Sequence, residues 1–304
     1  MIMTGFRKIE KCPDPRDPAF CIINGGGFNH CIKGNSAGRI YKYSVLPNCT
    51  GYVHARAIQV TGSDAKLCRG NAENYWSYSD GFPRGSEPRV GSIMCYRKGK
   101  AGNASDGAGH VVFVEDKNPK NGDVIVSESG WTGTMANGRY WRLRKIRRQG
   151  GTYSIGSDYT YQGSIYLYDD TRRPVFRLYN PNEGRHYFTE NSLEWTQLAM
   201  IGWEYEGLAW RSPAEGLPVF QLYNKQNGDH LLTTNAAERD DLVRLGLRLE
   251  GVAFRSASAK EKPVHRLYNP NSGEHFYTLN ADEKDILIRR GWKGEGVGFY
   301  ALAK

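Results

Sequence analysis

Residues 46–56, LPNCTGYVHAR, contain the strongest local signal in the chain. Cys49 follows Pro47 and Asn48 and opens a run with apolar residues at helical spacing, which predicts a helix that begins at or near the thiol. The backbone N–H groups of a first helical turn favour negative charge. The position of Cys49 therefore predicts a thiol with a lowered pKa.

Two later stretches supply an imidazole and a carboxylate: residues 107–115, GAGHVVFVE, and residues 126–131, VSESGW. His110 follows a glycine-rich loop and begins a β-branched and aromatic run, which predicts a buried strand. A second such run, residues 123–126, is expected to end just before Glu128. A catalytic cysteine needs a base within hydrogen-bond reach and a third group that fixes the base, so Cys49, His110 and Glu128 are the candidate catalytic residues.

Each of these three residues also has a structural interpretation. A lone cysteine is usually a small buried hydrophobe, a lone histidine is often a hydrogen-bonded core residue, and a lone glutamate is often a surface charge. The ordered set of motifs favours catalysis over these alternatives. His54 lies five residues after Cys49, on a different helix face, and is interpreted as structural or solvated.

The amino-acid sequences of these motifs resemble those of a known family. LPNCTGYVHAR, GNAENYW, DGFPRGSEPRVGSIMCY, GHVVFVE and SESGW together resemble the CHAP domain, the cysteine- and histidine-dependent amidohydrolase/peptidase of bacteriophage endolysins, over residues 24–167. The resemblance implies a papain-like α+β fold without a cofactor. It implies Cys49 as nucleophile, His110 as general base and then acid, and Glu128 as the residue that orients His110. The substrate would be an amide bond of peptidoglycan, cut as an N-acetylmuramoyl-L-alanine amidase or as an endopeptidase.

The sequence departs from this family at two places. Some members carry an asparagine two residues after the acid, where this chain has Gly130, so Ser127, Ser129 or a backbone group would have to supply that contact. Some relatives bind calcium through an acidic loop before the nucleophile. Residues 42–48 contain no Asp or Glu, and we therefore expect no metal there.

All 6 cysteines lie in the first third of the chain, without a CxxC pair, which disfavours a structural zinc site. Synthesis in a reducing cytosol argues against an obligatory disulfide framework. Cys12 and Cys21 flank a proline-rich segment and are the candidates for oxidation after release.

The second half of the chain repeats itself three times, as VFRLYNPNEGRHYFT, VFQLYNKQNGDHLLT and VHRLYNPNSGEHFYT. Each copy continues into an asparagine-led helical stretch and a further strand, so one repeat is predicted to be strand, hairpin, strand, short helix, strand. A unit of this size cannot bury its own apolar face. We expect three units closed about a pseudo-threefold axis as a β-rich, β-trefoil-like toroid, with an open stack as the alternative.

These observations predict two domains and a linker. The CHAP domain is expected over residues 1–168, the linker over 169–173 and the repeat domain over 174–304, with repeats 174–217, 218–262 and 263–304. The repeats resemble a three-repeat domain of uncharacterised function that is attached to bacterial secreted hydrolases and some endolysins, which implies targeting to the cell wall.

Sugar rings stack on flat apolar faces, so exposed aromatic side chains of the repeats are candidate wall-binding residues. The candidates are Tyr187, Trp203, Tyr277 and Trp292, with burial in the core as the alternative for each. Repeat 2 carries Leu231 and Leu247 at two of those places and is expected to bind most weakly. The recurring His186, His230 and His275 are interpreted as hydrogen-bonded structural residues rather than as a converging metal or anion site.

The formal net charge is +9, and the densest basic run is RLRKIRR, residues 142–148. Such a face attracts polyanions, either nucleic acid or the teichoic acid of a Gram-positive wall, unless it is only a solvated strand face. No zinc-finger, RNP or helix-turn-helix pattern accompanies the charge, which disfavours nucleic acid. No apolar run is long enough for membrane insertion, and the first residues lack the apolar segment of a signal peptide.

The sequence therefore predicts an endolysin that acts on peptidoglycan and binds wall carbohydrate or teichoic acid. We expect it in the host cytoplasm until lysis releases it to the wall. Two alternatives remain open: a bacterial autolysin or wall-targeting toxin with the same chemistry, and a non-catalytic wall-binding protein.

Overall fold

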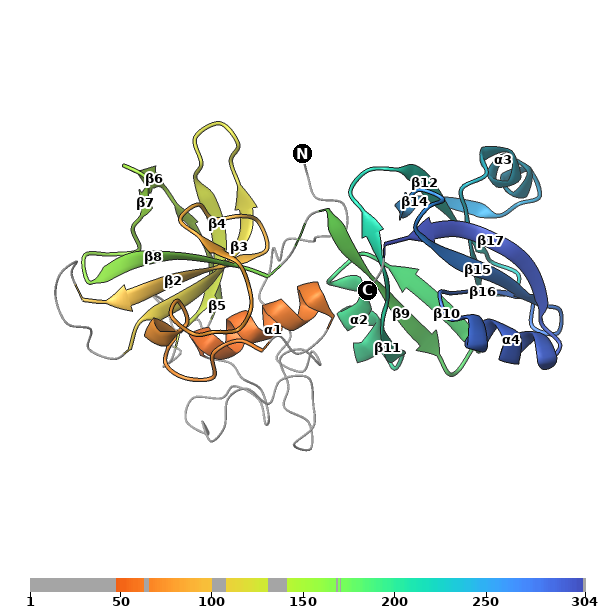
Figure 1. Cartoon of the computed structure of the whole chain (residues 1–304), viewed down its shortest axis with the longest axis horizontal. Coiled ribbons are helices and arrows are strands. Elements are labelled where there is room, and N and C mark those ends of the chain that lie inside the picture. Colours follow the sequence, from red (N-terminus) through yellow and green to blue (C-terminus); the bar gives the residue numbers. More distant parts are fainter. Residues whose placement is uncertain are drawn as a thin grey trace. The chain divides into compact units, whose positions relative to one another are not determined.

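The computed structural model describes residues 48–62, 66–99, 108–130, 141–167, 169 and 171–302. The chain divides into two compact units, one over Arg7–Tyr168 and one that takes in Asp169–Lys304 (Figure 1). We call them the N-terminal and C-terminal units. The fold is mixed, with mostly strands and a few short helices. No helix among the described residues has both the length and the apolar character needed to cross a membrane.

An antiparallel sheet of six strands forms the centre of the N-terminal unit, in the order β1-β8-β2-β3-β4-β5. One face of this sheet carries an apolar cluster that contains Met94, Val112, Val114 and Val126. The unit also contains a short hairpin, β6-β7, a 3-10 helix, η1 (Ala72–Asn74), and one α-helix. The strands are β1 (Arg84–Gly85), β2 (Ser92–Lys98), β3 (His110–Lys117), β4 (Val124–Ser129), β5 (Trp141–Ile146), β6 (Arg148–Gln149), β7 (Thr152–Tyr153) and β8 (Tyr159–Tyr166).

The helix α1 (Cys49–Thr61) packs against β3 and β4 (Figure 1). Its N-cap is Asn48, whose side-chain oxygen accepts the N–H of Gly51 at 2.8 Å. Its C-cap is Gly62, at φ 75, whose N–H donates to the carbonyl of Ile58. The two caps fix Cys49 as the first residue of the helix, as the sequence predicts.

The described part of the C-terminal unit contains three small sheets of three strands, and one helix accompanies each sheet. The order strand, hairpin, strand, helix, strand predicted for each repeat is confirmed. The first strand of each repeat lies in the middle of its sheet. The elements are β9 (Arg172–Asn180), β10 (Arg185–Thr189), α2 (Glu194–Met200) and β11 (Glu204–Pro213); β12 (Leu217–Asn224), β13 (Asp229–Thr233), α3 (Ala236–Arg244) and β14 (Arg248–Ser256); and β15 (Lys262–Asn269), β16 (Glu274–Thr278), α4 (Ala281–Arg289) and β17 (Lys293–Ala301).

The hairpin of each repeat closes through an asparagine and a glycine. In repeat 1, the side-chain oxygen of Asn180 accepts the N–H of Asn182, and the N–H of Gly184 donates to the Asn180 carbonyl. Gly184 has φ 65, in the left-handed region that glycine tolerates. The same pair recurs as Asn224 with Gly228 and as Asn269 with Gly273, which explains why this spacing repeats in the sequence.

The three repeats contact one another in a closed cycle. At the centre of their shared core, the equivalent aromatic residues Trp210, Phe254 and Phe299 touch pairwise, with ring centroids 5.3 to 5.7 Å apart. The last strands are joined by hydrogen bonds from repeat 1 to 2, from 2 to 3 and from 3 to 1: Ser212 Oγ to Arg255 O, Ser256 Oγ to Tyr300 O, and Leu302 N to Arg211 O. No repeat is therefore stabilised by its own contacts alone.

Candidate active site

Cys49, His110 and Glu128 come from three adjoining elements of the N-terminal unit. Cys49 begins α1, His110 begins β3, and Glu128 lies in β4, which pairs with β3. His110 Nε2 lies 2.6 Å from Glu128 Oε2, and His110 also hydrogen-bonds the half-buried Cys49 thiol. The three candidate residues thus form a connected chain of thiol, imidazole and carboxylate. The strand β4 continues to Ser129, beyond the end predicted at residue 126, so Glu128 belongs to the strand itself.

The backbone conformation and close contacts of Gly109 explain why a glycine directly precedes His110. Its φ is 63, and a Cβ there would lie 2.4 Å from the backbone nitrogen of Glu73 and 2.7 Å from the carbonyl oxygen of Tyr96. Any side chain at this position would therefore displace the backbone that leads into β3.

The thiol and the imidazole favour a charge-separated pair. Burial would raise the pKa of Cys49, but the hydrogen bond and charge of His110, with backbone hydrogen bonds from Val111 and Thr50, outweigh it and lower the pKa. Burial would lower the pKa of His110, but its hydrogen bonds to Cys49 and Glu128 and their charges raise this pKa to about 9. The two shifts together favour the pair of thiolate and imidazolium over the pair of neutral groups.

Two arginines that the sequence analysis assigned to a basic surface run hold Glu128 in place. Arg142 Nε lies 2.7 Å and Arg144 Nε 2.9 Å from Glu128 Oε1. Burial would raise the pKa of Glu128, but the hydrogen bond and charge of His110, followed by Arg144 and Arg142, lower it to about 2. The carboxylate is 1 % exposed and stays charged because it has three cationic neighbours.

Two of the other basic residues of this run pair with other carboxylates. Lys145 contacts Asp123 at 2.9 Å, and Arg148 contacts Glu87 at 2.8 Å. In the sequence, the alternation Arg142, Leu143, Arg144 was the available signal, because it places both arginines on one face of a strand.

A buried ion pair fixes α1 to the strand that carries His110. Arg56 on α1 donates to Glu115 on β3 through Nε at 3.0 Å and Nη2 at 2.9 Å, and both side chains are 0 % exposed. Ser127 Oγ donates to Glu115 Oε1 at 2.6 Å. This network sets the position of α1 relative to β3 and β4, and it was not among the sequence-based predictions.

The two serines of β4 that were expected to replace the family asparagine missing at Gly130 hydrogen-bond to other residues. Ser129 Oγ accepts the N–H of Asn48 at 3.2 Å, so it anchors the residue that caps α1. Ser127 Oγ donates to Glu115 and not to His110.

The remaining cysteine, histidine and metal predictions have separate outcomes. Cys68 and Cys95 are buried free thiols, and burial raises the pKa of Cys95. His54 is structural, because its Nε2 lies 2.9 Å from the Cys68 carbonyl oxygen and the residue is 1 % exposed. The Cys12 and Cys21 pair and the loop 42–47 lie outside the described residues. Among the residues that are described, no group of three His, Cys, Asp or Glu side chains is placed to hold a metal ion.

Of the four predictions of aromatic wall-binding residues, the one for Tyr277 is wrong. Tyr277 is 0 % exposed and its hydroxyl bonds to the backbone of Leu232. Tyr187 pairs with Leu178 of β9, and Phe276 pairs with the equivalent Leu267 of β15. Tyr187 is therefore equivalent to Phe276 and not to Tyr277. The two tyrosines lie on opposite faces of their strands. Tyr187, Trp203 and Trp292 are half-buried: Tyr187 and Trp203 meet edge to face at 6.1 Å, and Trp292 meets Phe276 at 6.0 Å.

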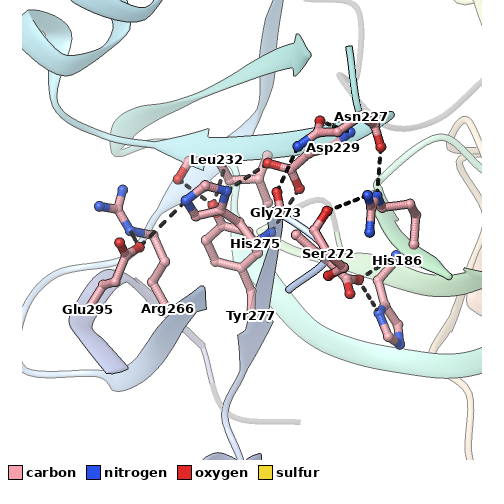
Figure 2. Close-up of polar contacts among 12 residues, drawn as sticks. His186, Asn227, Asp229, Leu232, Arg266, Ser272, Gly273, His275, Tyr277 and Glu295 are labelled. Carbon is pink, nitrogen blue, oxygen red and sulfur yellow. Dashed lines mark hydrogen bonds and ion pairs between the residues drawn. The ribbon is translucent and has the colours of Figure 1, made fainter. Parts of the chain in front are cut away.

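The recurring histidines are structural in two repeats. His186 Nδ1 lies 2.7 Å from Glu274, and His275 Nδ1 lies 2.7 Å from Asp229, each across a repeat boundary (Figure 2). His230 differs because Arg185 occupies the place that a carboxylate has in the other repeats. Its Nδ1 is buried without a hydrogen-bond partner among the described residues.

Comparison with known proteins gives two matches. Residues 174–302 match a domain of unknown function (DUF5648), and residues 39–130 match the CHAP domain. A search of curated proteins and a search of solved structures found no match. The CHAP match contains Cys49, His110 and Glu128, and it indicates a cysteine- and histidine-dependent amidohydrolase or peptidase that acts on peptidoglycan.

Proposed function

We propose that this protein is an endolysin that hydrolyses an amide bond of Gram-positive peptidoglycan, with a papain-like N-terminal unit as the enzyme. The observation that carries the proposal is the hydrogen-bonded series Cys49, His110 and Glu128 inside the region that matches the CHAP domain. A thiolate beside an imidazolium is the reactive form of a cysteine hydrolase.

The proposed reaction has two halves. The Cys49 thiolate attacks the scissile carbonyl carbon, and backbone N–H groups at the start of α1 stabilise the oxyanion. The His110 imidazolium then gives its proton to the leaving amine as the C–N bond breaks, which leaves a thioester. In the second half, neutral His110 takes a proton from water, the hydroxide attacks the thioester, and the acid product departs as the thiolate and imidazolium are restored.

Glu128 acts through His110 and does not touch the substrate in this mechanism. Its 2.6 Å contact fixes the orientation of the imidazole and stabilises the imidazolium, while Arg142 and Arg144 hold the carboxylate. It is therefore a positioning residue.

The direct test is lysis of susceptible cell walls by the Cys49→Ser variant. We expect turbidity loss to fall to background while wall binding persists. Cys68→Ser is the matched control, because Cys68 is a buried thiol outside the site, and it should retain lysis. Lysis by Cys49→Ser at the wild-type rate would remove Cys49 from the mechanism.

We further propose that the C-terminal unit binds a wall polymer, carbohydrate or teichoic acid, and that its three repeats form a β-trefoil-like toroid. The cyclic contacts of Trp210, Phe254 and Phe299 support closure around a common axis. The full-length Cys49→Ser protein should sediment with purified walls of a susceptible host. Failure to sediment with the walls of any host that the wild-type protein lyses would contradict the targeting role.

In this proposal the protein stays in the host cytoplasm until lysis releases it to the wall. A bacterial autolysin or wall-targeting toxin would use the same residues. The neighbouring genes would distinguish these proteins from a phage endolysin. A non-catalytic wall-binding protein is the alternative from another class. Selective labelling of Cys49 by a thiol reagent at neutral pH would count against it.

A further inference from the structure

Glu190 is a buried carboxyl group in repeat 1 of the C-terminal unit. It directly follows β10 and is 4 % exposed. Neither of its carboxyl oxygens has a hydrogen-bond partner among the described residues. Buried polar groups of native proteins are nearly always paired, and a buried carboxylate without partners is costly. The group is therefore easier to bury with its proton than without it.

The carboxyl occurs in repeat 1 alone. The residue that follows the second strand of the hairpin is Glu190 in repeat 1, Thr234 in repeat 2 and Leu279 in repeat 3. Thr234 donates its hydroxyl proton to the carbonyl of Gly298 at 3.4 Å, and leucine needs no polar partner. The fold of a repeat therefore does not require an acid at this position.

Ser212 on β11 joins repeat 1 to repeat 2 beside this carboxyl. Its Oγ accepts the N–H of Arg255 at 3.1 Å and donates to the carbonyl of Arg255 at 3.0 Å. Arg255 lies on β14 opposite Pro218, and Ser212 itself is 0 % exposed. We call this pair of hydrogen bonds the serine joint between repeats 1 and 2.

Groups from three neighbouring strands act on the carboxyl of Glu190: Arg173 on β9, Ser212 on β11 and Arg255 on β14. Burial is the largest influence and raises the pKa of Glu190 to about 7, against the Ser212 hydroxyl and the charges of Arg173 and Arg255. Of the described carboxyl groups with a shifted pKa, Glu190 is the only one that is shifted upward. Both protonation states are therefore accessible near neutral pH.

We propose that a proton on Glu190 controls the serine joint, which is closed while Glu190 is protonated and loosened when Glu190 loses the proton to solvent. A protonated Glu190 donates to the second lone pair of Ser212 Oγ, so the Ser212 proton stays on the Arg255 carbonyl. An ionised Glu190 can only accept. The Ser212 hydroxyl then turns to the carboxylate, and the Arg255 carbonyl loses its hydrogen bond.

The boundary between repeats 2 and 3 has the same joint without the acid. Ser256 Oγ accepts the N–H of Tyr300 at 3.0 Å and donates to the carbonyl of Tyr300 at 3.4 Å. The residue equivalent to Glu190 there is Thr234, which does not titrate. The second joint should therefore be insensitive to this change of pH and serves as an internal control.

Ionisation of Glu190 should lower the stability of the C-terminal unit. The folded state binds the proton more tightly than the unfolded chain, because the pKa is raised from 4.5 to about 7. The stability that this group contributes is complete below about pH 4.5 and is lost as the pH rises through about 7. The expected change in the unfolding equilibrium constant is on the order of a hundredfold. The inference goes beyond the proposed function and does not depend on what the unit binds.

The test uses the full chain at about pH 6 and about pH 8. Infrared spectroscopy should show a protonated-carboxyl band at the lower pH that is lost at the higher pH and is absent from Glu190→Gln. Hydrogen exchange, corrected for the intrinsic rate, should show that the protection of the Arg255 amide falls about tenfold over this range, as expected for one lost hydrogen bond. Glu190→Gln should keep this protection at both pH values, and the Tyr300 amide should be unaffected.

Two further variants complete the experiment. Glu215→Gln makes the same change at an exposed carboxyl of repeat 1 and should behave as the wild type. Glu190→Leu introduces the residue of repeat 3 and replaces Glu190→Gln if that variant does not fold.

Two results would overturn the proposal at different steps. A wild-type spectrum at about pH 6 without a band that depends on Glu190 would show that the carboxyl holds no proton there. Protection of the Arg255 amide that is equal at both pH values, or an equal loss at Tyr300, would show that Glu190 does not control the serine joint.

Discussion

At the scale of single residues, the protonation of Cys49 and His110 controls the proposed chemistry. The reactive form is present above the lowered pKa of Cys49 and is lost as the pH rises through about 9, where His110 loses its proton. These two ionisations belong to the coupled pair. We predict a bell-shaped dependence of kcat/KM on pH whose alkaline limb lies near pH 9.

Alkylation of Cys49 by iodoacetamide, mapped by mass spectrometry at each pH, reports the thiolate without any substrate. Reaction of Cys49 should persist below the pH range of an ordinary thiol, while the buried Cys95, whose pKa is raised, should react little. Equal reactivity of the two thiols at neutral pH would contradict the ion pair.

The charge of Glu128 sustains the imidazolium. Glu128→Gln keeps the size of the side chain but removes the charge, so the pKa of His110 should fall and the alkaline limb should move to lower pH by about one unit or more. The pH profile separates this effect from a merely structural one. Glu87→Gln is the matched control, because Glu87 pairs with Lys117 and Arg148 instead of His110. An unshifted limb in Glu128→Gln would remove Glu128 from its positioning role.

The sequence predicts these residues unequally, for physical reasons. Cys49 is recognisable because its helix start has a local signature, a capping asparagine followed by apolar periodicity. Arg142 and Arg144 were missed because a basic run resembles a solvated surface until the strand pairing shows which carboxylate it faces. Tyr277 was misjudged because a shift of one residue along a strand exchanges the two faces.

At the scale of elements, the buried pair of Arg56 and Glu115 holds α1 against β3. Glu115→Gln leaves the Arg56 guanidinium buried without its charged partner, which typically costs about 3–5 kcal/mol of stability. Denaturant unfolding of the N-terminal unit measures the loss. The double variant Arg56→Met/Glu115→Leu, which removes both charges, should be more stable than the single variant, and the opposite order would contradict this account.

The order of elements in the repeats was predictable, but the contacts between repeats were not. Turn asparagines and glycines act within a few residues and recur in the sequence, as at Asn180 and Gly184. The contact of His186 with Glu274 joins residues 88 positions apart, and no local pattern encodes such a pair.

At the scale of the whole molecule, the cyclic contacts predict that the three repeats unfold together. Phe254→Ala removes one of three mutually contacting aromatic residues and should cost about 3–5 kcal/mol. Hydrogen exchange should then show lost protection in β9, β12 and β15 together, because they share one core. Loss confined to β12 would indicate repeats that are stable on their own.

The central claim is that Cys49 cleaves an amide bond by way of a thioester. Mass spectrometry of fragments released from defined peptidoglycans in ¹⁸O-labelled water tests it most directly. The account predicts one new amine and one new carboxyl group per cut, with ¹⁸O in the carboxyl group, a hydroxamate in its place when hydroxylamine is added, and no fragments with Cys49→Ser. Release of the same fragments by Cys49→Ser, or products that carry new reducing sugar ends instead, would contradict it.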